Sequence, residues 1–162
     1  MLSALIHALV FSQLRYCISV YGNCSKGNLS RIQKVINYSA KIIFGRRKYD
    51  HVSDLLERLG WLGAESMASY HTLCVTHKVR RWGEPVQLAA GLSTVAEARV
   101  VERVTRQNGL LSVPRSRTEM GRRRFACRGP ALYNDLPRDL TELPVPLFSR
   151  RLKTYLVHTA PD

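Results

Sequence analysis

Apolar residues in the first part of the chain recur at the spacing of helices that bury one face. In the first segment they are separated by three or four positions: Ile6, Val10, Leu14, Cys17 and Tyr21. This pattern predicts an amphipathic helix that ends near Gly22. After the turn at 26–28, Asn28 is the expected N-cap of a second helix, which should end at Gly45. Its apolar stripe comprises Leu29, Ile32, Ile36, Ala40 and Ile43.

Two more helices are predicted before the pattern changes. A short one should run from Ser53 to Leu59 and close at Gly60, after which Trp61 and Leu62 should pack back onto the core. Residues 65–81 contain neither glycine nor proline and have one broad apolar face, so they should form a fourth helix. Because short turns join these segments, we expect them to pack as a small bundle.

A boundary or linker is expected at residues 83–93, where glycine, proline and serine interrupt the apolar pattern. Beyond it, residues 109–113 and 122–127 flank a turn at 119–121 and could form a short β-hairpin.

The C-terminal part should contain two helices. Pro130 is placed to open a short helix that ends before Pro137, and residues 147–157 predict a basic amphipathic helix. The predicted fold is therefore mainly α. It comprises a helical bundle at 1–82, a connection at 83–108, and an arginine-rich segment with the hairpin and terminal helix at 109–162.

The charge balance adds a functional prediction to this ordinary helical pattern. With 45% apolar and 23% charged residues, the 162-residue chain should bury a core. Its formal net charge is +13, from 25 lysines and arginines against 12 acidic residues. Such an excess indicates an anionic partner, and the predominance of arginine favours nucleic acid. The alternative is that the charge only keeps the chain soluble.

One candidate binding surface lies on the second predicted helix. Steps of three and four residues place three cations and one aromatic ring on a single face: Arg31, Lys34, Tyr38 and Lys41. The positive charge continues past the helix end at Arg46, Arg47 and Lys48. Such a face could follow a phosphate backbone and stack a base on the tyrosine. It could equally be an ordinary solvated face.

The densest positive segment lies between residues 103 and 128. Its arginines are opposed only by Glu119, and they are Arg103, Arg106, Arg115, Arg117, Arg122, Arg123, Arg124 and Arg128. Arginine at this density is typical of a nucleic-acid footprint.

Catalytic and metal-binding patterns are weak by comparison. The acidic pairs Asp50 with Asp54 and Asp135 with Asp139 are more simply helix caps and turn residues. His71, Cys74 and His77 share a helix, but no fourth zinc ligand is apparent. We therefore expect no enzyme activity, no metal and no cofactor. The cysteines have no paired spacing and no apolar run suits a membrane span, so we expect an intracellular protein of the cytoplasm or nucleus.

Five motifs in order along the chain carry a family resemblance. They are residues 8–23, with Leu14-Arg15-Tyr16-Cys17; residues 29–62, with Ile32-Gln33, Asn37 and Leu59-Gly60-Trp61-Leu62; Val113-Pro114-Arg115 with residues 117–125; Gly129-Pro130-Ala131-Leu132-Tyr133-Asn134; and Phe148 with Arg151-Leu152-Lys153. Together they resemble the late thumb and post-thumb region of reverse transcriptases from non-LTR (LINE-type, jockey-like) retrotransposons. Tyr21 and Tyr133 stand where that family usually has tryptophan.

The resemblance implies a piece of an RNA-directed DNA polymerase that holds nucleic acid without catalysing its synthesis. The palm motif Tyr-x-Asp-Asp and the endonuclease are not in this sequence, so no catalytic residue is carried over. Expected partners are RNA, DNA or an RNA–DNA hybrid, contacted through phosphates. Two alternatives remain open. The chain could be an inert remnant, or a module that docks on a polymerase palm through Leu5, Leu9 and Phe11.

Overall fold

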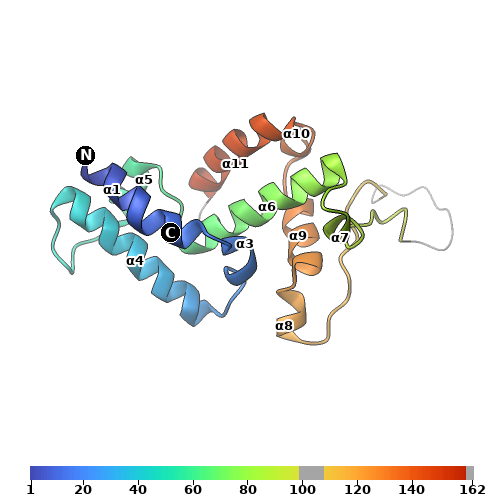
Figure 1. Cartoon of the computed structure of the whole chain (residues 1–162), viewed down its shortest axis with the longest axis horizontal. Coiled ribbons are helices and arrows are strands. Elements are labelled where there is room, and N and C mark those ends of the chain that lie inside the picture. Colours follow the sequence, from blue (N-terminus) through green and yellow to red (C-terminus); the bar gives the residue numbers. More distant parts are fainter. Residues whose placement is uncertain (99–107, 160–162) are drawn as a thin grey trace. The chain divides into compact units, whose positions relative to one another are not determined.

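A computed structural model describes residues 1–98 and 108–159 of the chain, and these residues are mainly helical (Figure 1). The mainly α prediction is thus confirmed. The elements are α1 (Leu2–Ile6), the π-helical turn η1 (His7–Phe11), α2 (Ser12–Arg15), α3 (Ile18–Tyr21), α4 (Lys26–Phe44), α5 (Ser53–Leu59), α6 (Ala64–Trp82), α7 (Val86–Ala89), α8 (Glu119–Arg122), α9 (Phe125–Asn134), α10 (Arg138–Thr141) and α11 (Val145–Thr159).

The chain divides into two compact units. Unit 1 comprises residues 1–71 and 153–162, and unit 2 comprises residues 72–152. The sequence pattern placed a boundary near 83–93, whereas the structure divides the chain inside α6 and inside α11. Both helices continue without a break through these points, so the sequence pattern gives no sign of the division.

The first predicted helix is broken before Gly22. Tyr16 is extended and Cys17 has a left-handed backbone with φ of 53°, so α2 ends and α3 starts in a new direction. A left-handed residue other than glycine costs about 1–2 kcal/mol. The Tyr21 hydroxyl donates to the Leu14 carbonyl, which has lost its helical partner, and Ile18 is buried in the core. Periodicity alone missed this turn because Cys17 and Tyr21 kept the helical spacing.

The predicted ends of the next two helices are confirmed. Gly45 and Gly60 follow α4 and α5 with φ of 61° and 59°, the left-handed conformation of a glycine C-cap. The predicted start of α4 at Asn28 is wrong, because the helix begins at Lys26 with Ser25 as its N-cap. The N–H groups of Asn28 and Leu29 both donate to the Ser25 carbonyl. Ser25 caps the helix through its backbone carbonyl, without a side-chain hydrogen bond, and the earlier start adds about one turn.

Gln33 joins α4 to the start of α6 inside unit 1. Its Oε1 accepts a 2.7 Å hydrogen bond from the N–H of Ala64, the first residue of α6, and its Nε2 donates to Asn37 Oδ1 at 2.7 Å. An N–H in the first helical turn has no partner within its own helix. Gln33 therefore acts as a cap supplied by a distant part of the chain.

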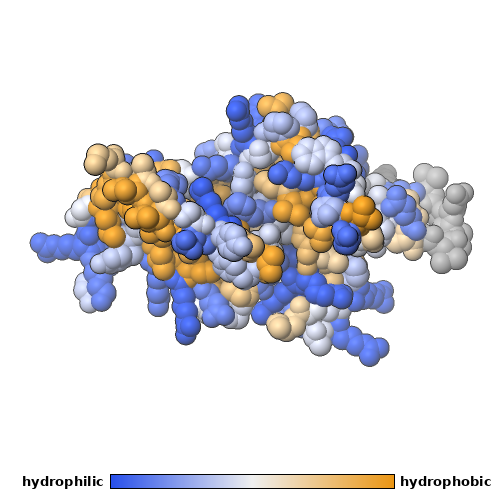
Figure 2. Space-filling model, viewed as in Figure 1, coloured by the Kyte–Doolittle hydropathy of each residue, from blue (hydrophilic) through white to orange (hydrophobic). Residues whose placement is uncertain are grey.

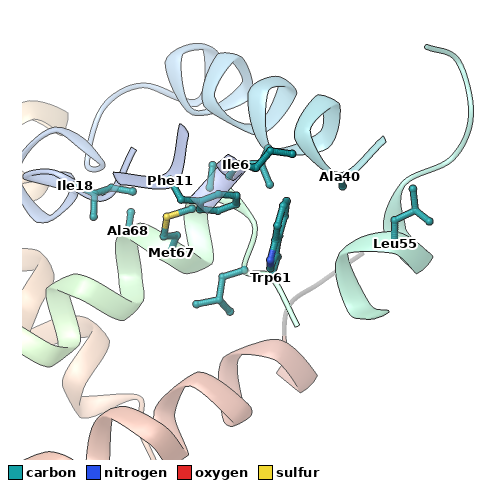
Figure 3. Packing of buried hydrophobic residues seen from close by; sticks show 11 residues of the cluster. Ile6, Phe11, Ile18, Ala40, Leu55, Trp61, Met67 and Ala68 are labelled. Atoms are coloured by element: carbon teal, nitrogen blue, oxygen red, sulfur yellow. The ribbon is translucent and has the colours of Figure 1, made fainter. Parts of the chain in front are cut away.

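The core of unit 1 gathers around two aromatic rings. Figure 3 shows Phe11, Met67 and Trp61 converging from η1, α6 and the α5–α6 loop. The ring centroids of Phe11 and Trp61 lie 4.4 Å apart with an edge-to-face tilt, a favourable aromatic geometry. Trp61 and Leu62 are buried, so the prediction that they pack on the core is confirmed.

The core of unit 2 is built around His77 of α6. Its Nδ1 lies 2.9 Å from the Tyr133 hydroxyl and its Nε2 lies 3.0 Å from the Leu143 carbonyl. Its ring stacks on Phe148 with centroids 3.9 Å apart. A carbonyl can only accept, so Nε2 carries a proton. Burial lowers the pKa of His77 and so favours the neutral imidazole, in which Nδ1 accepts from the Tyr133 hydroxyl.

The predicted hairpin between 109–113 and 122–127 is wrong. Leu111 forms an isolated antiparallel bridge with Thr94, and the second segment is helical in α8 and α9. Thr118 caps α8 by accepting a 3.1 Å hydrogen bond from the Gly121 N–H. This N-cap at Thr118 is a sequence signal for a helix, which the reading of a turn at 119–121 overlooked.

The short helix expected to open at Pro130 begins earlier. α9 starts at Phe125, where the N–H groups of Cys127 and Arg128 donate to the Arg124 carbonyl, so Pro130 lies inside the helix. The helix ends before Pro137, as predicted.

The last predicted helix is confirmed, and it is two residues longer at each end than predicted. It spans Val145–Thr159 rather than 147–157.

Candidate nucleic-acid interface

The arginine segment, residues 115–124, is one candidate interface and belongs to unit 2. The irregular stretch before α8 carries Arg115 and Arg117, and α8 ends with Arg122. All three side chains are exposed. Because no residue from 115 to 124 other than Glu119 is acidic, this short segment has a strongly positive potential.

The neighbouring arginines also serve the local structure. Arg123 is partly buried, and its Nε lies 3.4 Å from Glu119 Oε1 in an ion pair across one helical turn. Arg124 is exposed, and its Nε donates to the Gly121 carbonyl at 3.2 Å. Arg128 is half-buried. The structure thus separates the exposed guanidinium groups of Arg115, Arg117 and Arg122 from those of Arg123 and Arg124, which also make contacts within the segment.

Gly121 gives this segment a tight fold. A Cβ at Gly121 would lie 1.9 Å from Ser116 Oγ and 3.1 Å from Ser116 Cβ, so a larger residue would require the Ser116 side chain to move. The exposed arginines are therefore carried by a closely packed turn. A backbone held in this way loses less conformational entropy when its side chains bind a ligand.

The α4 surface, comprising Arg31, Lys34 and Tyr38, is the second candidate and belongs to unit 1. All three side chains are exposed, and Tyr38 has 59% of its surface accessible. Val35 and Ile42 are exposed on the same helix, so the face is not purely cationic. Lys41 differs from the prediction, because it is half-buried and its Nζ donates to the Lys48 carbonyl at 2.6 Å.

The loop after α4 continues this surface. Arg46, Arg47 and Lys48 are exposed, and the carboxylate of Asp50 accepts a 2.9 Å hydrogen bond from the Arg47 backbone N–H. Tyr49 is 89% exposed, and Lys48 Nζ lies 5.6 Å from the centre of its ring. Sequence reasoning did not include Tyr49, although a tyrosine directly after three cations offers a second ring for stacking a base.

A stronger signal in the sequence was also overlooked. None of the first 49 residues is acidic, so the cations from α2 to the end of the α4 loop have no carboxylate among them. Figure 2 shows hydrophilic side chains projecting from the α4 part of the molecule beside a band of hydrophobic ones. The α4 surface therefore combines an uncompensated positive charge with exposed apolar and aromatic groups.

The predicted cations form two separate sets. The α4 surface and its loop lie in unit 1, while the arginine segment lies in unit 2. Arg103 and Arg106 fall outside the described residues. Each set is thus a surface of its own unit.

The remaining chemical candidates have structural roles. Both ring nitrogens of His77 are engaged, and among residues 1–98 and 108–159 no group of histidines, cysteines and carboxylates is placed to hold a metal ion. Asp54 and Asp139 lie in the first turns of α5 and α10, where their charge favours the helix, and Asp135 follows the end of α9.

The chain matches no protein-family profile, no curated protein and no solved structure. Within the part of the chain that the structure describes, none of the helices has the length and apolarity needed to cross a membrane.

Proposed function

We propose that this chain binds nucleic acid through its phosphates and without sequence specificity. In this proposal it is a non-catalytic piece of a retrotransposon RNA-directed DNA polymerase, from the late thumb and post-thumb region. The observation that carries the proposal is the arginine segment, where Arg115, Arg117 and Arg122 are exposed and the only nearby carboxylate in the sequence, that of Glu119, is paired with Arg123. Guanidinium groups in this state are available for bidentate contacts with phosphate.

The lack of specificity follows from the kind of contact. Phosphates are the same at every base step, so cations that contact them fix position without reading sequence. Tyr38 and Tyr49 add ring surfaces that accept any base. Each surface would therefore contact a strand or duplex through its backbone, which is the role that the resemblance implies for a thumb.

Residues of the motif at 129–134 have packing roles in unit 2. Asn134 pairs with both backbone groups of Leu111, accepting at 2.9 Å and donating at 2.8 Å. A Cβ at Gly129 would lie 2.8 Å from Thr76 Oγ1, so glycine permits the close approach of α9 to α6. Tyr133 contacts His77. We therefore treat this motif as structural and assign binding to the exposed arginines.

The direct test is fluorescence anisotropy of labelled single-stranded RNA, duplex DNA and RNA–DNA hybrid with the purified chain across a salt series. We expect binding to all three, with log K falling by about 0.7 to 0.9 per phosphate contact for each unit of log salt. Sequence-scrambled probes of equal length should bind equally well. Absence of binding at low salt would reject the proposal and favour an inert remnant.

One observation favours a second candidate, docking on a polymerase palm. Leu5 and Leu9 are 49% and 70% exposed, and Leu2 beside them is also exposed, so apolar surface of α1 and η1 is available to a partner. The expected participation of Phe11 is wrong, because its side chain is only 2% exposed and packs on Trp61. Replacing Leu5 and Leu9 with serine should abolish association with a palm-containing protein if this candidate holds. Unchanged association would reject it.

A further inference from the structure

A cavity in unit 1 has no residue of the α4 surface or of the arginine segment in its lining. Its volume is about 290 Å³, at the lower end of the range for small-molecule sites. Apolar walls come from Phe11, Trp61 and Met67, whose convergence is visible in Figure 3. Arg15 of α2 and Lys153 of α11 line it from segments far apart in the sequence, so the fold itself brings the two cations to one cavity.

No carboxylate lines this cavity, so Arg15 and Lys153 give its lining a positive charge. That charge affects the imidazoles of His7 and His71. Burial lowers the pKa of His7, and the charges of Arg15 and Lys153 lower it further. Burial also lowers the pKa of His71, which lines the cavity, and the charge of Arg15 lowers it further. The positive charges of Arg15 and Lys153 repel each other in one cavity. An anion bound between them would be attracted to both and would offset that repulsion.

The shape of the site specifies more than an anion. The Arg15 guanidinium lies 5.3 Å from the centre of the Phe11 ring, so one cation of the lining contacts one of its aromatic walls. Trp61, Met67 and Tyr70 add aromatic and sulfur-containing surface to the lining. A free inorganic ion would leave that apolar wall unused, whereas a phosphate attached to a flat aromatic body would contact both parts of the cavity.

We propose that this cavity binds a nucleoside monophosphate unit, with its phosphate between Arg15 and Lys153 and its base against Trp61 and Tyr70. The unit could be a free nucleotide or the phosphorylated end of a strand, since both present the same chemistry. The free-nucleotide form does not depend on the proposed function, because it requires no contact with the α4 surface or the arginine segment.

The test uses Trp61 as a reporter in the full chain. The chain has two tryptophans, so Trp82→Phe leaves the indole in the cavity wall as the only one. We expect adenosine monophosphate to change its fluorescence saturably, and to bind more tightly than either inorganic phosphate or adenosine. Lys153→Gln should weaken this binding by about tenfold, the loss of one charged hydrogen bond.

Arg151→Gln is the matched control, because it removes the same charge from an exposed position of α11 that does not line the cavity. It should leave nucleotide binding unchanged. Thermal unfolding of each variant checks that unit 1 remains folded.

Strand sources are distinguished with oligonucleotides that carry either a 5′-phosphate or a 5′-hydroxyl group. A response to adenosine monophosphate, or a preference for the 5′-phosphate that Lys153→Gln removes, supports the proposal and identifies the source. No response to either ligand overturns it. Equal binding of inorganic phosphate alone, or an equal loss in Arg151→Gln, also overturns it, because the cavity would then act only through net charge.

Discussion

His77 is a buried residue whose neutral form is favoured by its burial. Burial lowers its pKa, and the charges of Arg81 and Arg80 lower it further, while the hydrogen bond to the Leu143 carbonyl acts in the opposite direction. In the unfolded chain the same imidazole titrates near its ordinary value of about 6.5. At pH values below that, the unfolded state therefore binds more protons than the folded state.

The free energy of unfolding should consequently fall as the pH drops below about 6.5. Above that pH the contribution of His77 should be fully present. His77→Phe keeps a ring against Phe148 and leaves Tyr133 its contact with the Thr141 carbonyl at 3.3 Å. This variant should flatten the pH dependence while lowering the free energy of unfolding by about 1–3 kcal/mol. Urea unfolding at a series of pH values measures both. An undiminished pH dependence in the variant would assign the effect to His7 and His71, whose pKa values are also lowered by burial.

Gly22 allows α3 and α6 to approach closely within unit 1. A Cβ there would lie 2.4 Å from the Ile18 carbonyl oxygen and 2.6 Å from Ala68 Cβ. Gly22→Ala should therefore destabilise the chain by about 1–3 kcal/mol through overpacking. Gly27→Ala is the control, because nothing lies within 4 Å of its added Cβ and α4 should tolerate alanine or gain slightly. Equal melting temperatures for the two variants would show that the close approach is not needed.

At the scale of elements, the sequence predicts some helices far better than others. The ends of α4 and α5 follow from Gly45 and Gly60, and α5 has the predicted bounds of Ser53 to Leu59. These signals are local, because a glycine C-cap needs no information from the rest of the chain. The turn at Cys17 depends instead on burying Ile18, which is a tertiary effect that no local pattern reveals.

Tyr38 is an exposed ring among the cations of the α4 surface. If Tyr38 stacks a base, Tyr38→Ala should weaken binding of single-stranded RNA by about 1–3 kcal/mol and leave duplex DNA almost unaffected, since paired bases do not expose their faces. Tyr38→Phe retains the ring and should bind like the native chain. Anisotropy titrations at one salt concentration compare the three proteins. A loss in Tyr38→Phe equal to that in Tyr38→Ala would exclude stacking.

At the scale of the whole molecule, the chain has a net charge of +13 and a separate cationic surface in each unit. The sequence predicts where the basic residues cluster. It does not predict which of their side chains are engaged by local partners and which remain exposed to a ligand. Lys41 and Arg123 were expected to face a ligand, yet one donates to the Lys48 carbonyl and the other pairs with Glu119. Such local partners depend on the turn after α4 and on the existence of α8, which become visible only once the chain is folded.

The exposed arginines of unit 2 allow the binding proposal to be separated from a simple effect of charge. Arg117→Gln with Arg122→Gln removes two cations from the arginine segment. Lys78→Gln with Arg138→Gln removes two exposed cations from elsewhere in the same unit. Both double variants have the same net charge, so any difference between them comes from position.

The most direct test of the central claim is the salt dependence of single-stranded RNA binding for the native chain and these two double variants. The account predicts that Arg117→Gln with Arg122→Gln flattens the slope of log K against log salt by about 1.4, from two lost phosphate contacts, and that the control keeps the native slope. Equal slopes for the two variants, or a native slope close to zero, would contradict a nucleic-acid interface at the arginine segment.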